Sequence, residues 1–308
     1  MSLVVRALLL LLPLVAAALW GSLYSPLTDQ VGGRYGISTG QLPPLPEWSR
    51  EPLPDFSSYR DTTEKKAAFF AFLYPRIVLA NSRVLMARQY LLKLSQQDTL
   101  SEAERAWLQA QSERLRVDSA VGSAENFTAL KQKLDAIPPS LVMAQAANES
   151  AWGTSRFARQ GNNLFGQWCF SAGCGLVPRR RGDDQSHEVA AFASPYGSVR
   201  AYIENLNRHR SYRDLRQTRA QARQAGKKPD GLTMANGLLR YSERGDAYVK
   251  EIQGMIRFNN LGYFDRQFAR LLASPSGETL QHIAVASEER SLMPPTTTAT
   301  QPGPAHEG

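Results

Sequence analysis

Apolar residues recur at helical spacing through most of the chain after residue 64. The stretch 64–97 has them at intervals of three and four, and Pro75 inside it predicts a break or kink between two helices. Ser101 and Glu104 then form the pattern of a capping box at the start of another helix. The region 64–120 is therefore predicted to be helical.

A further helix is predicted over residues 141–151, capped by Ser140 and ended by Gly153. One face of this helix carries Leu141, Gln145, Glu149 and Trp152. No Lys or Arg lies one turn away from Glu149, so the carboxylate has no counter-ion within the helix. Partial desolvation disfavours the charged form, which suits a general acid, whereas the alternative is an ordinary edge residue of an apolar stripe.

The pattern changes over residues 164–192, where Gly, aromatic residues and a short alternating run predict a small β-hairpin. Helices return at Pro195, and further ones are predicted at 211–224, 232–241 and 247–259. The predicted fold class is mainly α (α+β), with one principal domain over 121–272. The remainder, 273–308, has too little apolar content to fold and is predicted to be a disordered tail.

The first 24 residues are predicted to be an export signal or a membrane anchor, because Arg6 precedes an apolar run that contains small residues. The Pro- and Gly-rich segment 25–63 then resembles a linker. The chain has a formal net charge of +8. An exported basic protein is expected in the periplasm or envelope, where wall polymer and the inner-membrane surface are anionic, and not on nucleic acid.

The two cysteines, Cys169 and Cys174, are expected to pair as a disulfide in an oxidising compartment. A zinc site would need more ligands, and His187 is the only histidine nearby. We therefore expect no metal and no organic cofactor.

Residues 144–168, which read AQAANESAWGTSRFARQGNNLFGQW, resemble the core motif of glycoside hydrolase family 73, the bacterial glucosaminidases. Over about 60–265 the chain resembles the Bax-type branch of that family. The resemblance implies a lysozyme-like helical fold with a groove, and it makes Glu149 the general acid. Ser150 and Trp152 of the same motif are expected at the substrate.

A sugar-binding groove needs aromatic faces for the pyranose rings and amides for the hydroxyl groups. Asn163, Phe165 and Trp168 could supply these, although the two aromatic residues could instead belong to the core and Asn163 could only end a turn. In the resemblance, the segment YSERGDAY implies that Tyr241 lines the groove, while Tyr248 is expected in the core.

Glycoside hydrolysis usually needs a second carboxylate. The family tends to carry a Glu before the strand that follows N-L-F-G, and this chain departs from that pattern. Glu188 ranks first as the replacement because strand alternation could point it into a groove, whereas Asp183 and Asp184 lie in a predicted turn. Assistance by the N-acetyl group of the substrate is the alternative.

Together with the predicted export signal, the resemblance implies a peptidoglycan hydrolase that cleaves β-1,4 bonds at N-acetylglucosamine in glycan strands. Two alternatives stay open. A lytic transglycosylase would also use a single Glu but would close an anhydro ring. A non-hydrolytic wall-binding protein would keep the fold without the second carboxylate.

Overall fold

The computed structural model describes residues 35–179, 186–273 and 277–294 and confirms a mainly helical fold with a small antiparallel sheet. The predicted signal or anchor, residues 1–24, lies outside the described residues, as do Asp183 and Asp184. The principal helices are α3 (Thr62–Leu94), α4 (Glu102–Leu115), α5 (Ala124–Lys133), α6 (Pro139–Ser150), α7 (Arg156–Gly161), α8 (Pro195–Arg208), α9 (Arg213–Gln224), α10 (Gly231–Met234), α11 (Asp246–Phe258), α12 (Gly262–Leu271) and α13 (Gly277–Ala284). Short 3-10 helices are η1 (Glu47–Arg50), η2 (Phe56–Ser58), η3 (Arg210–Tyr212), η4 (Ala235–Leu238) and η5 (Glu289–Leu292).

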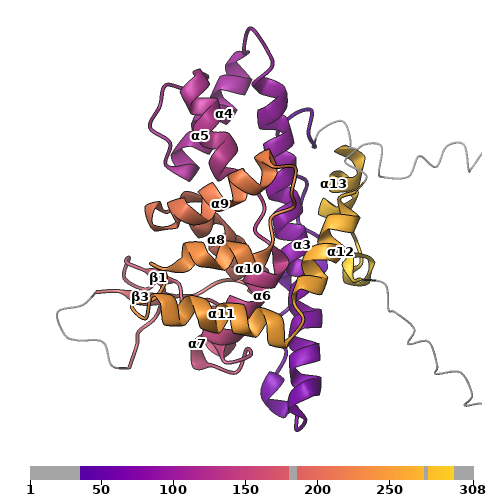
Figure 1. Ribbon diagram of the computed structural model, residues 1–308, viewed down its shortest axis with the longest axis vertical. Coiled ribbons are helices and arrows are strands. Elements are labelled where there is room, and N and C mark those ends of the chain that lie inside the picture. Colours follow the sequence, from indigo (N-terminus) through magenta and orange to yellow (C-terminus); the bar gives the residue numbers. More distant parts are fainter. Residues whose placement is uncertain (1–34, 180–185, 274–276, 295–308) are drawn as a thin grey trace, which may run out of the picture.

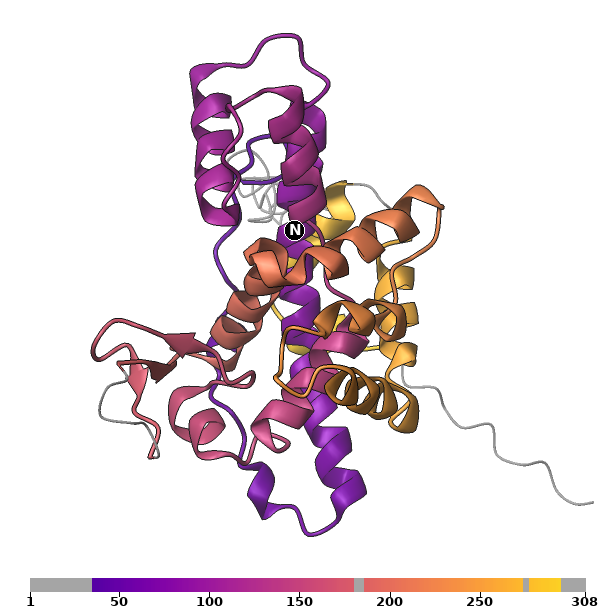
Figure 2. The same ribbon diagram turned by 60° about the vertical axis from the view of Figure 1, so that its left-hand side comes forward.

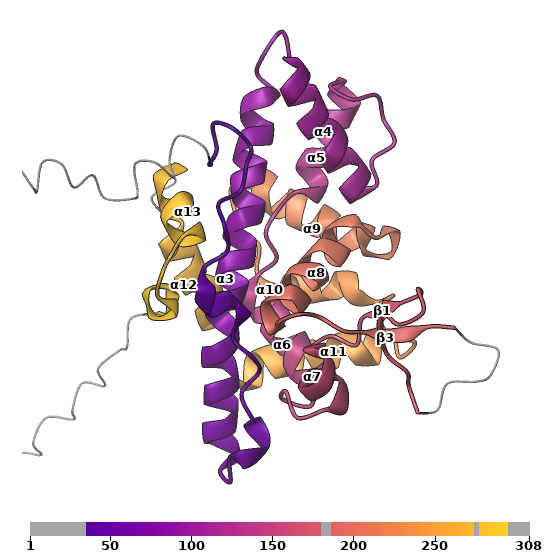
Figure 3. The same cartoon turned by 180° about the vertical axis from the view of Figure 1, so that it is seen from behind.

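Helix α3 runs through the centre of the molecule, and α5, α6, α8 and α13 pack along it (Figures 1 and 3). The predicted break at Pro75 is wrong, because α3 is a single helix of 33 residues. Apolar side chains on both sides of the proline are buried, among them Leu73 and Ile77. Their burial on both sides outweighs the cost of about 3 kcal/mol that a proline imposes inside a helix.

By length and composition α3 could also cross a membrane, but 78% of its most apolar window is buried inside the protein. The same measure is met by core helices of soluble proteins, so it does not by itself indicate a membrane span.

The second half of the predicted linker is part of the fold. Trp48 and Phe56 are buried in the main core, and the Trp48 indole N–H donates to the carbonyl of Ala286 at 2.8 Å. A Cβ on Gly153 would lie 2.6 Å from the Phe56 ring, so the two segments fit only because that residue is glycine. The linker prediction is thus wrong for residues 35–63, since a few aromatic anchors suffice to dock a Pro-rich segment.

The described part of the predicted tail also folds. Leu280 and Ile283 of α13 are buried in the core around α3. Glu289 forms an ion pair at 2.6 Å with Arg76, whose side chain is fully buried. Residues 277–294 therefore correct the prediction of disorder after 273, because few but well-placed apolar residues and one buried cation hold them.

Two hydrophobic clusters fill the molecule, and α3 contributes to both. The larger one surrounds α6, α8 and α11, whereas the smaller one joins the end of α3 to α4 and α5. Leu130 on α5 belongs to the smaller cluster with Leu108 and Leu115 of α4. The predicted boundary near residue 120 therefore falls inside that cluster and not between two cores.

The predicted hairpin is a three-stranded antiparallel sheet, with strands β1 (Trp168–Cys169), β2 (Gly175–Leu176) and β3 (Glu188–Ala190) in the order β1-β3-β2. The register places Cys169 opposite Glu188 and Gly175 opposite Ala190. Figure 2 shows the sheet projecting to one side of α3. Cys169 and Cys174 form the expected disulfide, which closes the connection between the two outer strands.

The N-terminus of α6 is held by a neighbouring helix instead of by its own cap. Ser140, the predicted cap, is the second residue of α6, and its N–H and hydroxyl donate to Asp265 at 2.8 and 2.6 Å. The N–H of Gly231, at the start of α10, donates to the same carboxylate at 3.1 Å. Desolvation raises the pKa of Asp265 to about 6 although these hydrogen bonds oppose it.

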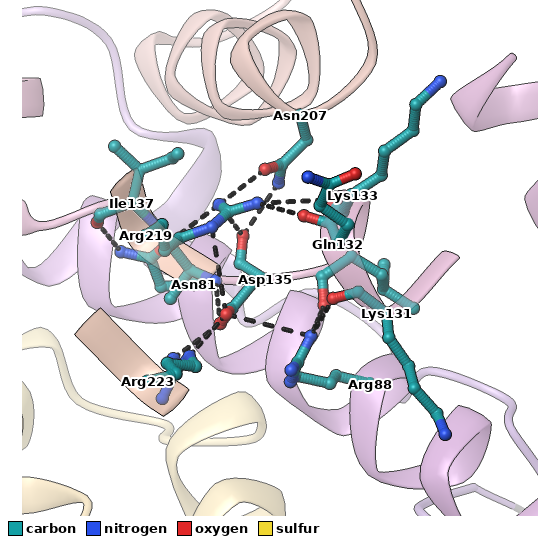
Figure 4. A network of polar contacts seen from close by, with 12 residues as sticks. Asn81, Arg88, Lys131, Gln132, Lys133, Asp135, Ile137, Asn207, Arg219 and Arg223 are labelled. Carbon is teal, nitrogen blue, oxygen red and sulfur yellow. Dashed lines mark hydrogen bonds and ion pairs between the residues drawn. The ribbon is translucent and has the colours of Figure 1, made fainter. Parts of the chain in front are cut away.

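The connection into α6 is fixed by a buried network around Asp135 (Figure 4). Its carboxylate accepts hydrogen bonds from Arg223 and lies 3.8 Å from both Arg88 and Arg219. Burial raises the pKa of Asp135, but Arg219 and the other two guanidinium groups lower it more, and the net shift is downward. Arg219 is buried and also donates to the carbonyls of residues 132, 133, 135 and 136, which ties α9 to this connection.

Replacing Asp135 by Asn should lower the free energy of unfolding by about 3–5 kcal/mol at pH 7, because it leaves buried guanidinium groups uncompensated. Urea unfolding measures this loss. Asp118→Asn is the matched control, since Asp118 is exposed, and it should change stability by less than about 0.5 kcal/mol. Equal stability of the two variants would show that the network does not hold the fold.

Asp265 should titrate near pH 6, as followed by carboxyl NMR. Its folded pKa lies above the ordinary value of 3.8, so the folded protein holds this proton more tightly than the unfolded chain. The free energy of unfolding should therefore fall by about 2–3 kcal/mol as pH rises from about 4 to about 6. Asp265→Asn should lack this component, and an unchanged pH profile in that variant would refute the assignment.

Candidate active site

Glu149 lies in the last turn of α6, half-buried, with its carboxylate directed toward α11 and the N-L-F-G turn. The hydroxyl of Tyr248 donates to Glu149 Oε1 at 2.7 Å, and the Asn148 amide approaches the same oxygen at 3.5 Å. A Cβ built on Gly166 would lie 3.9 Å from Glu149 Oε2. The N-L-F-G segment, Asn163 to Gly166, therefore lies beside Glu149 although the two are separated along the chain.

A chain of buried hydrogen bonds leads to Glu149 from the core. The Tyr202 hydroxyl donates to the carbonyl oxygen of Gln145, and the Gln145 amide donates to the Tyr248 hydroxyl at 2.8 Å. Because the Gln145 oxygen already accepts from Tyr202 and the Gln145 amide donates to the Tyr248 oxygen, the Tyr248 hydroxyl proton donates to Glu149. Burial raises the pKa of Tyr202 and of Tyr248, so both phenols stay protonated donors.

Tyr241 lies near Glu149, and its expected place in a substrate groove stays a prediction. Its ring stacks on Tyr248 with 5.3 Å between centroids, and its hydroxyl donates to the Phe165 carbonyl at 2.8 Å. Burial, and then the nearby Glu149 charge, raise the pKa of Tyr241. Tyr248 was expected only in the core. It is 2% exposed, yet its hydroxyl contacts the candidate acid, and its place in the YSERGDAY segment was the signal for this role.

Asn163 and Phe165 are not presented to a ligand, which corrects two expected substrate contacts. The Asn163 amide donates to the carbonyls of Gln167 and Ala190, while its oxygen accepts from the N–H groups of Phe165 and Gln167. The Phe165 ring is buried and stacks on Tyr202 at 4.0 Å. Both side chains shape the N-L-F-G turn, since a buried amide must satisfy its own hydrogen bonds.

Ser150 also has a structural role instead of the expected substrate contact. It is buried, its hydroxyl donates to the Ala146 carbonyl, and it accepts the N–H of Gly153 where α6 ends. Trp152 is half-buried, packs edge-on against Phe70 and carries the Lys66 ammonium 5.1 Å from its ring centre. Trp152 therefore belongs largely to the core, which leaves its contact with substrate a prediction.

The chain is similar to known proteins over the region that contains these residues. The family described as mannosyl-glycoprotein endo-beta-N-acetylglucosaminidase matches residues 124–261, which include Glu149, Tyr241 and Tyr248. The protein Bax of Escherichia coli (strain K12) is 35% identical over 209 residues, which cover 67% of this chain and 74% of the relative. The chain belongs to the glucosaminidase family. No solved structure matches it.

Membership of the glucosaminidase family implies a glycosidase type of enzyme and a glycan substrate. The aromatic faces that such a substrate needs are present on the sheet. Trp168 is 61% exposed and one face of its ring stacks on His187 at 4.3 Å, so its contact with substrate stays a prediction. Phe170 is 73% exposed and lies between Cys169 and Cys174, in the disulfide loop. Its exposure was not predicted, because the sequence pattern gave no reason to expect an exposed Phe at this position.

Glu188 lies on β3, next to the loop that the disulfide closes. It is buried, and its two carboxylate oxygens accept the backbone N–H groups of Gly173 at 3.0 Å and Gly175 at 2.7 Å. The side chain thus holds the disulfide loop, which corrects the expectation that it points into a groove. Within the described residues, no hydrogen bond or ion pair links Glu149 to a second carboxylate or to a cation.

Cys169, Cys174 and Glu188 also lie close enough to suggest a metal site, with ligand atoms within 4.8 Å of one another. The two sulfur atoms are bonded to each other, however, so they offer no thiolates to a metal ion.

A pocket of about 680 Å³ lies beside α10 and α12, and none of the candidate site residues lines it. Pocket size therefore does not point to the candidate residues.

Glu188→Gln should loosen the disulfide loop, because a neutral amide has a single acceptor oxygen where the carboxylate has two. We expect faster amide hydrogen exchange at Gly173 and Gly175, by about tenfold for a loss of about 1.4 kcal/mol. Exchange at the α6 amides serves as the internal control and should stay unchanged. Unaltered exchange in the loop would show that Glu188 does not hold it.

Proposed function

We propose that this protein hydrolyses the β-1,4 bond at N-acetylglucosamine in peptidoglycan glycan strands, with Glu149 as the general acid. The observation that carries the proposal is the chain of neutral donors that ends on Glu149 in a family whose substrates are glycans. A carboxyl held by one directed phenol keeps its other oxygen available for a ligand, here Oε2 beside Gly166.

In the proposed reaction Glu149 donates its proton to the glycosidic oxygen as the bond to the anomeric carbon breaks. Water then adds to the anomeric carbon and returns a proton to Glu149, which restores the acid. Trp168 and Phe170 provide exposed aromatic faces on the sheet for the sugar rings.

Glu188 has no chemical step in this proposal, because both of its oxygens already accept backbone hydrogen bonds. Assistance by the N-acetyl group of the substrate then supplies the internal nucleophile. This route requires one protein carboxylate only. A lytic transglycosylase also uses one carboxylate and is the second candidate for the same reason.

The proposed substrate lies in the cell envelope, and the sequence supports export to it. Residues 1–24 have the features of a signal or anchor, and the formal net charge of +8 favours an anionic surface. We therefore propose that the protein acts in the periplasm or at the inner membrane.

Glu149→Gln should abolish release of soluble fragments from purified sacculi, with a loss on the order of 100-fold or more, because Gln keeps the shape but has no proton to donate. Sacculus binding, measured by co-sedimentation, should be retained. Glu102→Gln is the matched control, since Glu102 is exposed on α4, and it should digest at the parent rate. Parent-like digestion by the Glu149 variant would end the proposal.

Tyr248→Phe should lower turnover by about tenfold, since one hydrogen bond to a charged or reacting group contributes about 1.5 kcal/mol or more. The aromatic ring remains, so the stack on Tyr241 should persist, whereas the buried Gln145 amide loses its acceptor and the free energy of unfolding should fall by about 1–3 kcal/mol. Tyr59→Phe, on an exposed ring, serves as the control in the same digestion assay. A Tyr248 variant with full activity would show that this hydrogen bond does not orient the acid.

A further inference from the structure

A second pocket, of about 270 Å³, lies where α4 and α8 meet α3 and the segment at Gly40. It shares no residue with the candidate active site. The Trp107 indole donates to the Gly40 carbonyl at 3.0 Å and fixes the N-terminal segment at its edge. Apolar side chains form much of the wall, namely Leu42, Val84, Leu115 and Leu134, and the polar residues gather on the α3 and α8 sides.

Two buried polar atoms of this pocket have no hydrogen-bond partner among the described residues. They are the Nη1 of Arg83 and the hydroxyl of Tyr196, a residue that is 2% exposed. A buried donor without a partner costs about 1–3 kcal/mol, and more when it is charged. Two such donors in one small pocket are a stronger sign of a ligand than either would be alone.

The pocket also carries an excess of positive charge, which would favour an anionic ligand. Arg83, Arg114 and Arg200 line it, and its carboxylate, Glu204, is engaged by Arg114 at 3.1 Å and also by Arg208 outside the pocket. No ion pair of the described chain involves Arg83 or Arg200. Burial lowers the pKa of Arg83, Tyr196 raises it and Arg200 lowers it, so the three groups interact electrostatically.

We propose that this pocket binds an oxyanion, the carboxylate or phosphate group of a small molecule with a compact apolar portion. Arg83 and the Tyr196 hydroxyl donate to the anion, and Arg200 attracts it at the rim. Guanidinium groups and a phenol are donors suited to such oxygens. The volume of about 270 Å³ is near the lower end for ligand sites, which limits the ligand to a small group.

Calorimetric titration of the full-length protein tests the site with inorganic phosphate, with N-acetylalanine as a carboxylate and with uncharged N-acetylalaninamide. We expect one saturable site for at least one of the two anions, with a dissociation constant of about 1 mM or lower, and none for the amide. The tighter of the two anions identifies the source of the oxyanion.

Arg200→Gln and Tyr196→Phe should each weaken binding of that anion by about tenfold, as expected for the loss of one charge-assisted hydrogen bond or its charge. Arg210→Gln is the control, because it removes the same charge from an exposed residue of the following 3-10 helix that does not line the pocket. If Tyr196→Phe unfolds, as circular dichroism would show, Arg200→Gln decides alone. The proposal is overturned if neither anion gives saturable binding, or if Arg210→Gln weakens binding as much as Arg200→Gln.

Discussion

Burial of α3 along its length is the constraint on which the rest of the structure depends. The helix contributes to both hydrophobic clusters, and α6, α8 and α13 all pack on it (Figure 1). This arrangement puts α6 in the interior, where most of its side chains are buried. Small residues such as Ala144, Ala146 and Ala147 allow that central position, because they let neighbouring helices approach closely.

Polar side chains on a helix buried as deeply as α6 must find their hydrogen-bond partners inside the protein. Gln145 is fully buried one turn before Glu149, and a buried amide must satisfy both its donor and its acceptor. Tyr202 on α8 donates to the Gln145 oxygen, and Tyr248 on α11 accepts from the Gln145 amide. Tyr248 in turn donates to Glu149, so each hydrogen bond of the chain is donated toward Glu149. The orientation of the candidate acid is therefore a consequence of core packing, because the same contacts that satisfy Gln145 aim Tyr248 at Glu149.

The sequence was sufficient for the features that local chemistry determines. Periodicity predicted the helical class, and the motif around Glu149 placed that residue where the structure brings the second half of the motif beside it. The wrong predictions concern residues whose local structure depends on contacts with segments far away in the sequence. Pro75 is tolerated because both flanking turns are buried, and Trp48 and Leu280 anchor segments whose composition suggests a linker and a tail.

The same reason explains the site residues that were misassigned. Asn163 and Glu188 have the chemistry of ligand-binding residues, but each satisfies backbone groups in a turn that spacing alone does not reveal. Tyr248 shows the reverse, since a residue expected in the core also carries the hydrogen bond to Glu149. A buried side chain can therefore also contact the candidate acid, because Glu149 lies at the end of a helix that belongs to the core.

The chemical outcome of cleavage tests the central claim most directly. Digestion of sacculi by the full-length protein in heavy-oxygen water, followed by mass spectrometry of the fragments, reports where water enters. Hydrolysis with Glu149 as general acid predicts N-acetylglucosamine at each new reducing end, with one labelled oxygen. Unlabelled anhydro ends would establish a transglycosylase, and binding without soluble fragments would establish a wall-binding protein, so either result would contradict hydrolysis by Glu149.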